Sequence, residues 1–452
     1  MKQPPTILCV NPWIHDFAAY DFWARPLGLL SLAAILKAHG CRVFYIDCTD
    51  RFHPRADPPA DPPERFGRGP YRKTRIQKPS ALRHIPRHFS RYGIDPEWFL
   101  DDLRGLPRPD LVLVTSIMTY WYTGAHETIG LIKQVFPGVP VVLGGLYAQL
   151  CEAHARATSP ADAVAPDVSD LGVLKLVEEH TGTALPPRFD PADPDDRPFP
   201  ALELQSAVPF VPLQTTVGCP FSCPYCASRF LHPTMSRRSP SAVVREIELR
   251  YRTSGMRDFV FYDDAFLVNA EAHAVPMLEE LIGRGLPLRF HTPNALHVRE
   301  INTRTASLMR RAGFETIRLG LETADFENRK TFDAKVTGEE FARAVVCLKE
   351  AGFSERQIGA YLLVGLPGQS LESMLNSIAI VTAAGITPIP TYYTPIPHTA
   401  LWTAAAADSP FDLEAEPLLT NNAVMPCLPG GFSWDVITRL RSAGRKNVDT
   451  RG

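Results

Sequence analysis

The chain has 452 residues, of which 45% are hydrophobic and 21% are charged, and its formal net charge is -2 at pH 7. This composition matches ordinary globular domains and excludes a disordered or fibrous protein. The balanced charge gives no general attraction to nucleic acid or to an anionic membrane, so neither is expected as a partner. A chain of this length exceeds one ordinary core and predicts two large domains with a short tail.

The cysteine content and the hydropathy pattern indicate a compartment. No stretch reaches the roughly 18 apolar residues that a membrane-spanning helix needs. The nine cysteines are an odd number and are scattered apart from one cluster, which argues against a disulfide framework and for a reducing environment. The expected location is therefore the cytoplasm.

The first half of the chain alternates short apolar runs with amphipathic segments, the pattern of βαβ units around a parallel sheet. These segments are, in order, 6–10, 27–39, 42–47, 110–115, 124–136 and 139–144. Residues 1–184 are thus predicted to form a Rossmann-like domain, and a linker rich in Pro and Asp follows at 185–204.

Residues 51–94 interrupt this domain with eleven Lys or Arg against three acidic residues. Such an insertion is too long for a normal connection, so it is either functional or partly disordered. The simplest interpretation is a solvated basic loop. The alternative is a lid, or a docking surface for an acidic partner or for cofactor phosphates, formed by His84, Arg87, His88 and Arg91.

The second half repeats a strand followed by a helix about six times, which predicts a partial (β/α)6 barrel over residues 205–407 and a C-terminal tail over 408–452. The expected strands are 212–216, 259–262, 288–291, 316–320, 360–364 and 388–393. Two helix starts support this register. Ser239 precedes Pro240 as a cap, and Thr337 with Glu340 forms a capping box.

Three cysteines follow the first barrel strand with the spacing Cys-x3-Cys-x2-Cys, at Cys219, Cys223 and Cys226. Thiolates this close together can hold three irons of one cubane, because soft sulfur ligands suit iron and zinc and because two prolines stiffen the loop. Structural zinc usually has four protein ligands, and no second pair follows at suitable spacing. The prediction is an iron–sulfur cluster that leaves one iron without a protein ligand.

This cysteine loop, with Tyr225 before the third cysteine, and the strand–helix repeat after it resemble the radical SAM superfamily over about residues 205–400. The resemblance implies a [4Fe-4S] cluster whose open iron chelates S-adenosylmethionine (SAM). Reduction then splits SAM to methionine and a 5'-deoxyadenosyl radical, with a flavodoxin or ferredoxin as the reductant.

The resemblance also implies SAM contacts at the carboxyl ends of the barrel strands, where barrel active sites form. The residues expected there are Tyr225, Asp263, Asp264, Asn294, Glu322, Gly365, Pro367 and Gly368. Simpler interpretations stay open, namely a helix cap for the two adjacent aspartates and a tight turn for the glycines.

The front domain resembles the cobalamin-binding domain that precedes many radical SAM enzymes. A hydroxyl after one strand, Ser116, and a glycine pair after the next, Gly144 and Gly145, match its motif, whereas the Asp-x-His-x2-Gly element is absent. The implied cobalamin contacts are His15, Asp47, Ser116, Met118, Gly144 and Gly145. The competing interpretation is a domain that binds no cofactor and covers the barrel mouth.

With cobalamin, the resemblance implies methyl transfer to an unactivated carbon of a small-molecule or peptide substrate. The alternatives are a radical cyclase, oxidase or rearrangement enzyme, and a non-catalytic iron–sulfur redox protein. The pattern assigns no catalytic residue. Cys427 is either an additional ligand or a catalytic thiol or, more simply, a tail cysteine without a special role. The role of His398 is open. The aromatic residues 120–122 either line a pocket or belong to the core.

Overall fold

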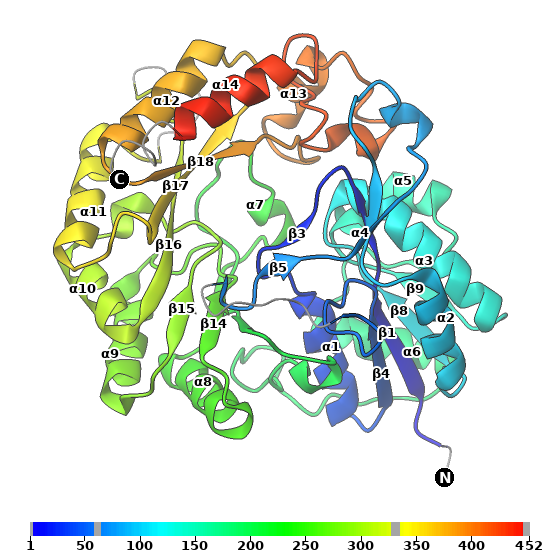
Figure 1. Ribbon diagram of the computed structural model, residues 1–452. Coiled ribbons are helices and arrows are strands. Elements are labelled where there is room, and N and C mark those ends of the chain that lie inside the picture. Colours follow the sequence, from blue (N-terminus) through cyan, green and yellow to red (C-terminus); the bar gives the residue numbers. More distant parts are fainter. Residues whose placement is uncertain (1–2, 58–64, 327–334, 446–452) are drawn as a thin grey trace. The chain divides into compact units, whose positions relative to one another are not determined.

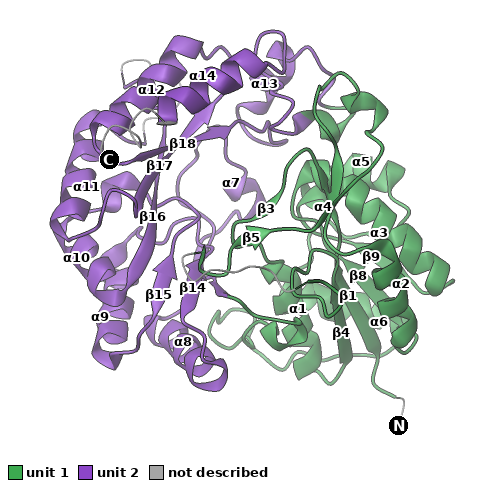
Figure 2. Ribbon diagram, in the orientation of Figure 1, with its two compact units in different colours: residues 1–209, 414–419 green, residues 210–413, 420–452 purple. Residues whose placement is uncertain are grey.

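The computed structural model describes residues 3–57, 65–326 and 335–445 (Figure 1). The chain divides into two compact units, which are coloured separately in Figure 2. Unit 1 contains residues 1–209 and 414–419, and unit 2 contains residues 210–413 and 420–452. Within the described ranges, no helix is long and apolar enough to cross a membrane.

Unit 1 is built on a parallel sheet with the strand order β10-β9-β8-β1-β4. The strands are β1 (Thr6–Asn11), β4 (Arg42–Asp47), β8 (Leu111–Val114), β9 (Val141–Leu143) and β10 (Ala163–Val164). The helices are α1 (Leu27–Ala38), α2 (Pro96–Gly105), α3 (Tyr122–Val135), α4 (Leu146–Leu150), α5 (Glu152–Thr158) and α6 (Asp170–Thr181). Every residue of β1 is buried, because β1 lies in the interior of the sheet between β8 and β4. The predicted Rossmann-like fold class is confirmed.

The basic insertion is folded wherever it is described, at 51–57 and 65–94. Its strand β7 (Ser90–Tyr92) pairs antiparallel with β2 (Ile14–Asp16) and with β6 (Lys73–Arg75). Strands β3 (Tyr20–Asp21) and β5 (Gly69–Pro70) pair next to it. The expectation of a solvated loop is wrong for these residues, because apolar side chains spaced among the basic ones are buried, namely Leu82, Ile85, Phe89 and Tyr92. Residues 58–64 lie outside the described residues.

The four insertion residues singled out from the sequence have different surroundings. Arg91 forms an ion pair with Glu127, and the Arg87 guanidinium lies 5.5 Å from the centre of the Phe17 ring. His84 and His88 are exposed. The lid or docking role stays a prediction.

Unit 2 is built on a six-stranded parallel sheet with the order β11-β14-β15-β16-β17-β18. The strands are β11 (Val211–Leu213), β14 (Asp258–Phe261), β15 (Arg289–His291), β16 (Phe314–Glu322), β17 (Ile358–Val364) and β18 (Thr387–Tyr392). The main helices are α8 (Pro240–Ser254), α9 (Ala274–Arg284), α10 (Thr303–Ala312), α11 (Gly338–Glu350) and α12 (Leu371–Ala383), which cover the outer face of the sheet (Figure 1). Strands β11 and β18 are not paired with each other, so the predicted partial barrel is confirmed.

Both predicted helix starts are present. The Ser239 hydroxyl accepts a hydrogen bond from the backbone N–H of Ala242 at the start of α8. Thr337 and Glu340 form a reciprocal capping box at the start of α11. Each cap satisfies backbone donors that the first helical turn leaves without an intrahelical partner.

The chain segments around the predicted boundaries are folded. Phe189 and Ala201, from the predicted linker, pack into the core of unit 1. In the predicted tail, residues 414–419 belong to unit 1, and α14 (Trp434–Arg445) packs against α12 in unit 2. Helix α13 (Trp402–Asp408) comes just before this tail. The domain limits read from the sequence stay predictions.

Candidate active site

The three cysteines lie on the loop that follows β11 at its carboxyl end. The loop begins with the short strand β12 (Thr216–Val217), which pairs antiparallel with β13 (Ser236–Arg237), and it ends at helix α7 (Ser228–Leu231). A backbone hydrogen bond of 3.0 Å from Cys226 to Cys223 closes the final turn. The backbone N–H of Ser228 then points at the Cys226 sulfur, 3.4 Å away.

The electrostatics of this loop favour the binding of iron cations between the three cysteine sulfurs. Burial raises the pKa of the Cys219 thiol and raises that of Cys226 to about 11, and nearby Asp264 and the neighbouring cysteines add to both shifts. Cys226 is exposed by its surface area, but protein atoms crowd the loop around its sulfur. Three thiolates therefore repel one another here, and iron cations bound between them would remove that cost.

The ligand side chains of a cubane are also spaced differently from those of a single metal ion. Among the described residues, no three His, Cys, Asp or Glu side chains converge on one metal ion. Each cysteine of a cubane binds a different iron, so such convergence is not required. The donor set is thus suited to a [4Fe-4S] cluster with one open iron.

The two adjacent aspartates after β14 have opposite orientations. One oxygen of Asp263 accepts hydrogen bonds from the backbone N–H and the hydroxyl of Thr215, at 3.0 and 2.6 Å, and from the same groups of Thr216, at 2.5 and 2.8 Å. Asp263 thus ties β14 to the segment that leads into the cysteine loop. Asp264 is exposed and accepts a hydrogen bond of 2.5 Å from the Ser228 hydroxyl. The predicted SAM contact is not supported for Asp263 and stays open for Asp264.

Asn294 and Glu322 end the next two strand segments along the sheet. The Asn294 amide donates to the Tyr262 carbonyl oxygen at 2.8 Å, while the side chain is otherwise exposed. Glu322 is buried, lies 3.7 Å from the Lys335 ammonium and has a φ of 63°, in the left-handed region. A non-glycine residue in that region typically marks a functional or tightly constrained position.

The loop after β17 is held in an open conformation by one side chain. The Gln369 oxygen accepts from the backbone N–H of Gly365 at 2.8 Å and of Leu366 at 3.2 Å. Gly365 and Gly368 have φ values of 83° and 70°, and no atom lies within 4 Å of where a Cβ would stand on either glycine. This backbone is free to approach a ligand closely, as the resemblance implies for Gly365, Pro367 and Gly368.

Tyr225 connects the cysteine loop to the C-terminal part of unit 2. It packs against a small apolar cluster that contains Leu366, Tyr393 and Cys427. Burial raises the pKa of the Cys427 thiol to about 12, and its sulfur lies 3.8 Å from the Ala405 carbonyl oxygen. Cys427 is therefore a packing residue, and a role as thiolate ligand or nucleophile is not supported. The exposed His398 ring stacks on Phe230, with a centroid distance of 4.0 Å.

One residue near the cysteines was missed from the sequence. The Nε2 atom of His297, in the segment after β15, lies 3.8 Å from the Cys219 sulfur. The His297 ring is also 4.7 Å from the ring of Phe221, which stands inside the cysteine motif. A lone histidine in an irregular segment has no periodic or motif signal, so only the tertiary fold reveals this contact.

Unit 1 has a recess at the carboxyl edge of its sheet, with an open volume of about 360 Å³. It lies where the loops after β1 and β8 diverge, which is the switch point at which open parallel sheets bind ligands. The lining residues are Asn11, Pro12, Trp13, Ile14, Ala24, Thr49, Tyr71, Ser116, Ile117 and Trp121. Of the predicted cobalamin contacts, Ser116 lies in this lining.

Ser116 and the predicted glycine pair contact one another. The Ser116 hydroxyl donates to the Gly144 carbonyl oxygen at 3.0 Å and accepts from the Tyr147 N–H at 3.1 Å. Gly145 has a φ of 84°, and a Cβ on it would stand 2.4 Å from the Ser116 carbonyl oxygen. The hydroxyl and the glycine therefore maintain a close approach of two loops beside the recess.

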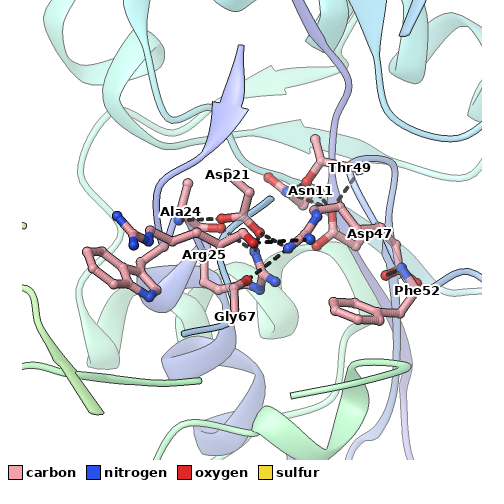
Figure 3. A network of polar contacts seen from close by, with 12 residues as sticks. Asn11, Asp21, Ala24, Arg25, Asp47, Thr49, Phe52 and Gly67 are labelled. Carbon is pink, nitrogen blue, oxygen red and sulfur yellow. Dashed lines mark hydrogen bonds and ion pairs between the residues drawn. The ribbon is translucent and has the colours of Figure 1, made fainter. Parts of the chain in front are cut away.

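Asp47 forms hydrogen bonds with two residues that line the recess (Figure 3). One of its oxygens accepts from the Asn11 amide at 2.8 Å and from the Thr49 hydroxyl at 2.7 Å, and both of those residues line the recess. Burial raises the pKa of Asp47, and the positive charge of Arg25 opposes that rise. Arg25 itself pairs with Asp21 at 2.9 Å.

His15 and Met118 are placed differently from the prediction. The Nε2 atom of His15 lies 2.9 Å from a Glu127 oxygen, and Nδ1 lies 3.1 Å from the Thr123 hydroxyl. Both ring nitrogens therefore face α3, and a cobalamin contact by His15 is not supported. Met118 is partly buried just before a 3-10 turn and is outside the recess lining.

Comparison with known proteins gives one family match. Residues 213–380 match the model of the Radical SAM superfamily, and this range includes the cysteine loop and, in full, four of the six strands of the large sheet of unit 2. An uncharacterized methyltransferase of Pyrococcus horikoshii is 25% identical over 329 residues, which cover 67% of this chain and 70% of that protein. The anaerobic magnesium-protoporphyrin IX monomethyl ester cyclase of Cereibacter sphaeroides is 25% identical over 315 residues, which cover 62% of this chain but only 50% of the cyclase.

Solved structures share the fold of both units. The radical SAM methyltransferase TsrM of Kitasatospora setae, solved with cobalamin and a [4Fe-4S] cluster, matches with a TM-score of 0.64 and 17% identity, over 90% of this chain and 76% of TsrM. The cobalamin-dependent SAM radical enzyme OxsB matches with a TM-score of 0.57 and 13% identity, over 89% of this chain and 55% of OxsB. Residues 213–380, which contain the three-cysteine loop at the carboxyl end of the first barrel strand, therefore form a domain of the radical SAM superfamily.

Proposed function

We propose that this protein is a radical SAM enzyme that holds a [4Fe-4S] cluster and SAM in unit 2 and cobalamin in unit 1, and that it methylates an unactivated carbon. The observation that carries this proposal is the combination, in one chain, of the three-cysteine loop after β11 with a switch-point recess in a separate parallel sheet. The names of several relatives support methyl transfer, among them a cytidylyl-2-hydroxyethylphosphonate methyltransferase of Streptomyces wedmorensis, 22% identical over 446 residues.

The residues of unit 2 would bind and orient SAM beside the cluster. When bound, the cluster and SAM together supply a 5'-deoxyadenosyl radical, and cobalamin supplies a transferable methyl group. Asp264 and Asn294 present exposed polar atoms at neighbouring strand ends. The Gly365–Gly368 turn leaves its backbone open, and Tyr225 packs an aromatic ring next to Leu366 on this loop. These groups can hold the amino acid and adenine parts of SAM in fixed positions.

The residues that would contact cobalamin lie around the recess of unit 1. Gly145 keeps the loops after β8 and β9 in close contact, and the recess beside them has both apolar and polar walls. Both ring nitrogens of His15 contact Glu127 and Thr123 of α3, so His15 is left out of the proposed cobalamin contacts. The polar atoms of Asn11 and Thr49 in the lining are preorganised by Asp47.

Radical SAM enzymes need an external electron donor. We propose a flavodoxin or a ferredoxin for this role and the cytoplasm for the location. The odd number of cysteines, scattered apart from one cluster, supports a reducing compartment. The substrate is proposed only as a small molecule or a peptide.

The first test is anaerobic purification with iron and cobalt quantification, followed by dithionite and SAM and a mass-spectrometric assay for 5'-deoxyadenosine. Wild-type protein is expected to contain about four irons and about one cobalt per chain and to form 5'-deoxyadenosine. Cys223→Ala should lose the cluster and reduce 5'-deoxyadenosine to background. Cys347→Ala, a buried cysteine of α11, is the matched control and should keep both.

The outcomes separate the alternatives. Deoxyadenosine formed without bound cobalt would exclude methyl transfer and would favour a radical cyclase, oxidase or rearrangement enzyme. A full cluster that forms no deoxyadenosine with SAM would contradict the proposed radical chemistry and leave a redox protein. Deuterated methyl groups passing from SAM to bound cobalt, seen by mass spectrometry, would support the methyltransferase directly.

A further inference from the structure

We propose that His297 donates a hydrogen bond from its Nε2–H to the sulfur of Cys219 and thereby raises the reduction potential of the cluster. This inference rests on the proposed function, because it concerns the cluster that the cysteines would hold. It gives His297 a positioning and tuning role rather than a catalytic one.

The contact is direct and its geometry is constrained. The Nε2–sulfur distance is 3.8 Å, within the range of hydrogen bonds to sulfur, which are longer than those to oxygen. Only 4% of His297 is exposed, so water does not compete for the contact. The Phe221 ring packs against the imidazole at 4.7 Å, and the Arg299 guanidinium lies 5.9 Å from the centre of the same Phe221 ring.

The surroundings decide which ring nitrogen carries the proton. The Nδ1 atom is buried and has no hydrogen-bond partner among the described residues. A proton on Nδ1 would leave that donor unsatisfied and would turn the Nε2 lone pair toward an iron-bound thiolate. A proton on Nε2 instead pairs donor with acceptor.

The effect on the cluster follows from charge. Reduction adds one negative charge, which spreads over the cluster and its cysteine sulfurs. A hydrogen bond to a sulfur therefore stabilises the reduced form more than the oxidised form and raises the potential. The neighbouring donor on Cys226 is the backbone N–H of Ser228, which no side-chain change removes. The His297 side chain is thus a donor to this loop that a substitution can remove.

The test is an anaerobic redox titration of reconstituted full-length protein, followed by electron paramagnetic resonance of the reduced cluster. His297→Leu fills the space without a donor and should lower the ratio of reduced to oxidised cluster about tenfold at a fixed potential, which corresponds to about 59 mV for a one-electron couple. His297→Gln keeps an N–H donor and should recover most of that ratio. His398→Asn is the control, because His398 stacks on Phe230 and its left-handed φ of 66° tolerates Asn.

A second measurement needs no substitution. In wild-type protein labelled with ¹⁵N-histidine, pulsed electron paramagnetic resonance should detect a histidine nitrogen coupled to the reduced cluster. Equal potentials for wild type and His297→Leu at equal iron content, or the absence of this coupling, would overturn the role of His297 while leaving the proposed function intact. A wild-type chain that binds no cluster would overturn both.

Discussion

Asp263 is a buried carboxylate that receives all four of its described hydrogen bonds on one oxygen. The other oxygen is buried without a hydrogen-bond partner among the described residues. Burial raises the pKa of Asp263 to about 6, although the hydrogen bonds from Thr215 and Thr216 oppose the rise. The Asp263 side chain therefore links the second barrel strand to the cysteine loop, although burial makes its charged form unfavourable.

A pH dependence follows from that raised pKa. Between about pH 4 and pH 6 the folded protein keeps a proton that the unfolded chain releases, so the contribution of Asp263 to stability falls as the pH rises through this window. A shift of about two units corresponds to at most about 3 kcal/mol. Urea unfolding of cluster-free protein from pH 4 to pH 7 should show this loss in wild type and not in Asp263→Asn.

Two substitutions distinguish charge from connection at this position. Asn keeps an acceptor oxygen for both threonines and replaces the unpaired oxygen by an uncharged amide, so Asp263→Asn should still load iron. Asp263→Ala removes the acceptor of four buried hydrogen bonds and should lose cluster content as well as stability. Identical pH profiles for wild type and Asp263→Asn would contradict the assigned pKa.

At the scale of elements, the loops after β8 and β9 meet in unit 1 through backbone rather than through long side chains. A Cβ on Gly145 would lie 2.5 Å from the Ser116 backbone nitrogen, which is too close. Gly145 also has a left-handed φ, which favours glycine. Gly144, the residue before it, has its nearest atom at 3.5 Å, an ordinary contact. The two glycines of the predicted motif therefore have unequal roles.

Alanine substitution of each glycine tests this difference. Gly145→Ala should lower the free energy of unfolding by about 1–3 kcal/mol through backbone strain and steric overlap, and should weaken cobalamin binding by displacing Ser116. Gly144→Ala should change both by much less. Thermal unfolding and equilibrium dialysis with cobalamin measure the two effects, and equal losses for both variants would show that the backbone contact is unimportant.

At the scale of the whole molecule, unit 1 is completed by a segment from near the C-terminus. The Tyr122 hydroxyl at the start of α3 donates a hydrogen bond of 3.0 Å to Glu416, which is 294 positions away in the chain. Glu416 also accepts from the backbone N–H of Leu418 at 2.9 Å. Tyr122 in turn stacks on Tyr147, with centroids 5.2 Å apart. The fold of unit 1 therefore depends on a part of the chain made after residues 210–413 of unit 2.

A double-mutant cycle measures this long-range contact. Tyr122→Phe should destabilise the protein by about 1.5–3 kcal/mol, the range for hydrogen bonds to charged groups. Glu416→Ala should cost a similar amount, and the double variant should cost much less than the sum of the two. Urea unfolding gives the three values. Strictly additive losses would mean that the two side chains do not interact in solution.

Much of the fold and part of the site could be predicted from the sequence, because their signals are local. The repeat of a strand followed by a helix predicted all six strands of the large sheet of unit 2, and the Thr337 and Glu340 pair predicted the start of α11. The cysteine spacing indicated its chemistry at once, since three soft ligands within eight positions restrict what can bind. Ser116 and Gly145 were singled out through the resemblance to the cobalamin-binding domain, and their cobalamin contacts stay predictions.

The direction of a side chain and contacts distant in sequence were decided only by the tertiary structure. Asp263 and His15 both come after predicted strands, yet Asp263 turns back to the threonines after β11 and His15 turns to α3, because packing neighbours select the rotamer. His297 meets Cys219 across 78 positions, and Glu416 meets Tyr122 across 294. Such pairs have no periodicity or spacing in one sequence, since they exist only once the separate elements have packed together.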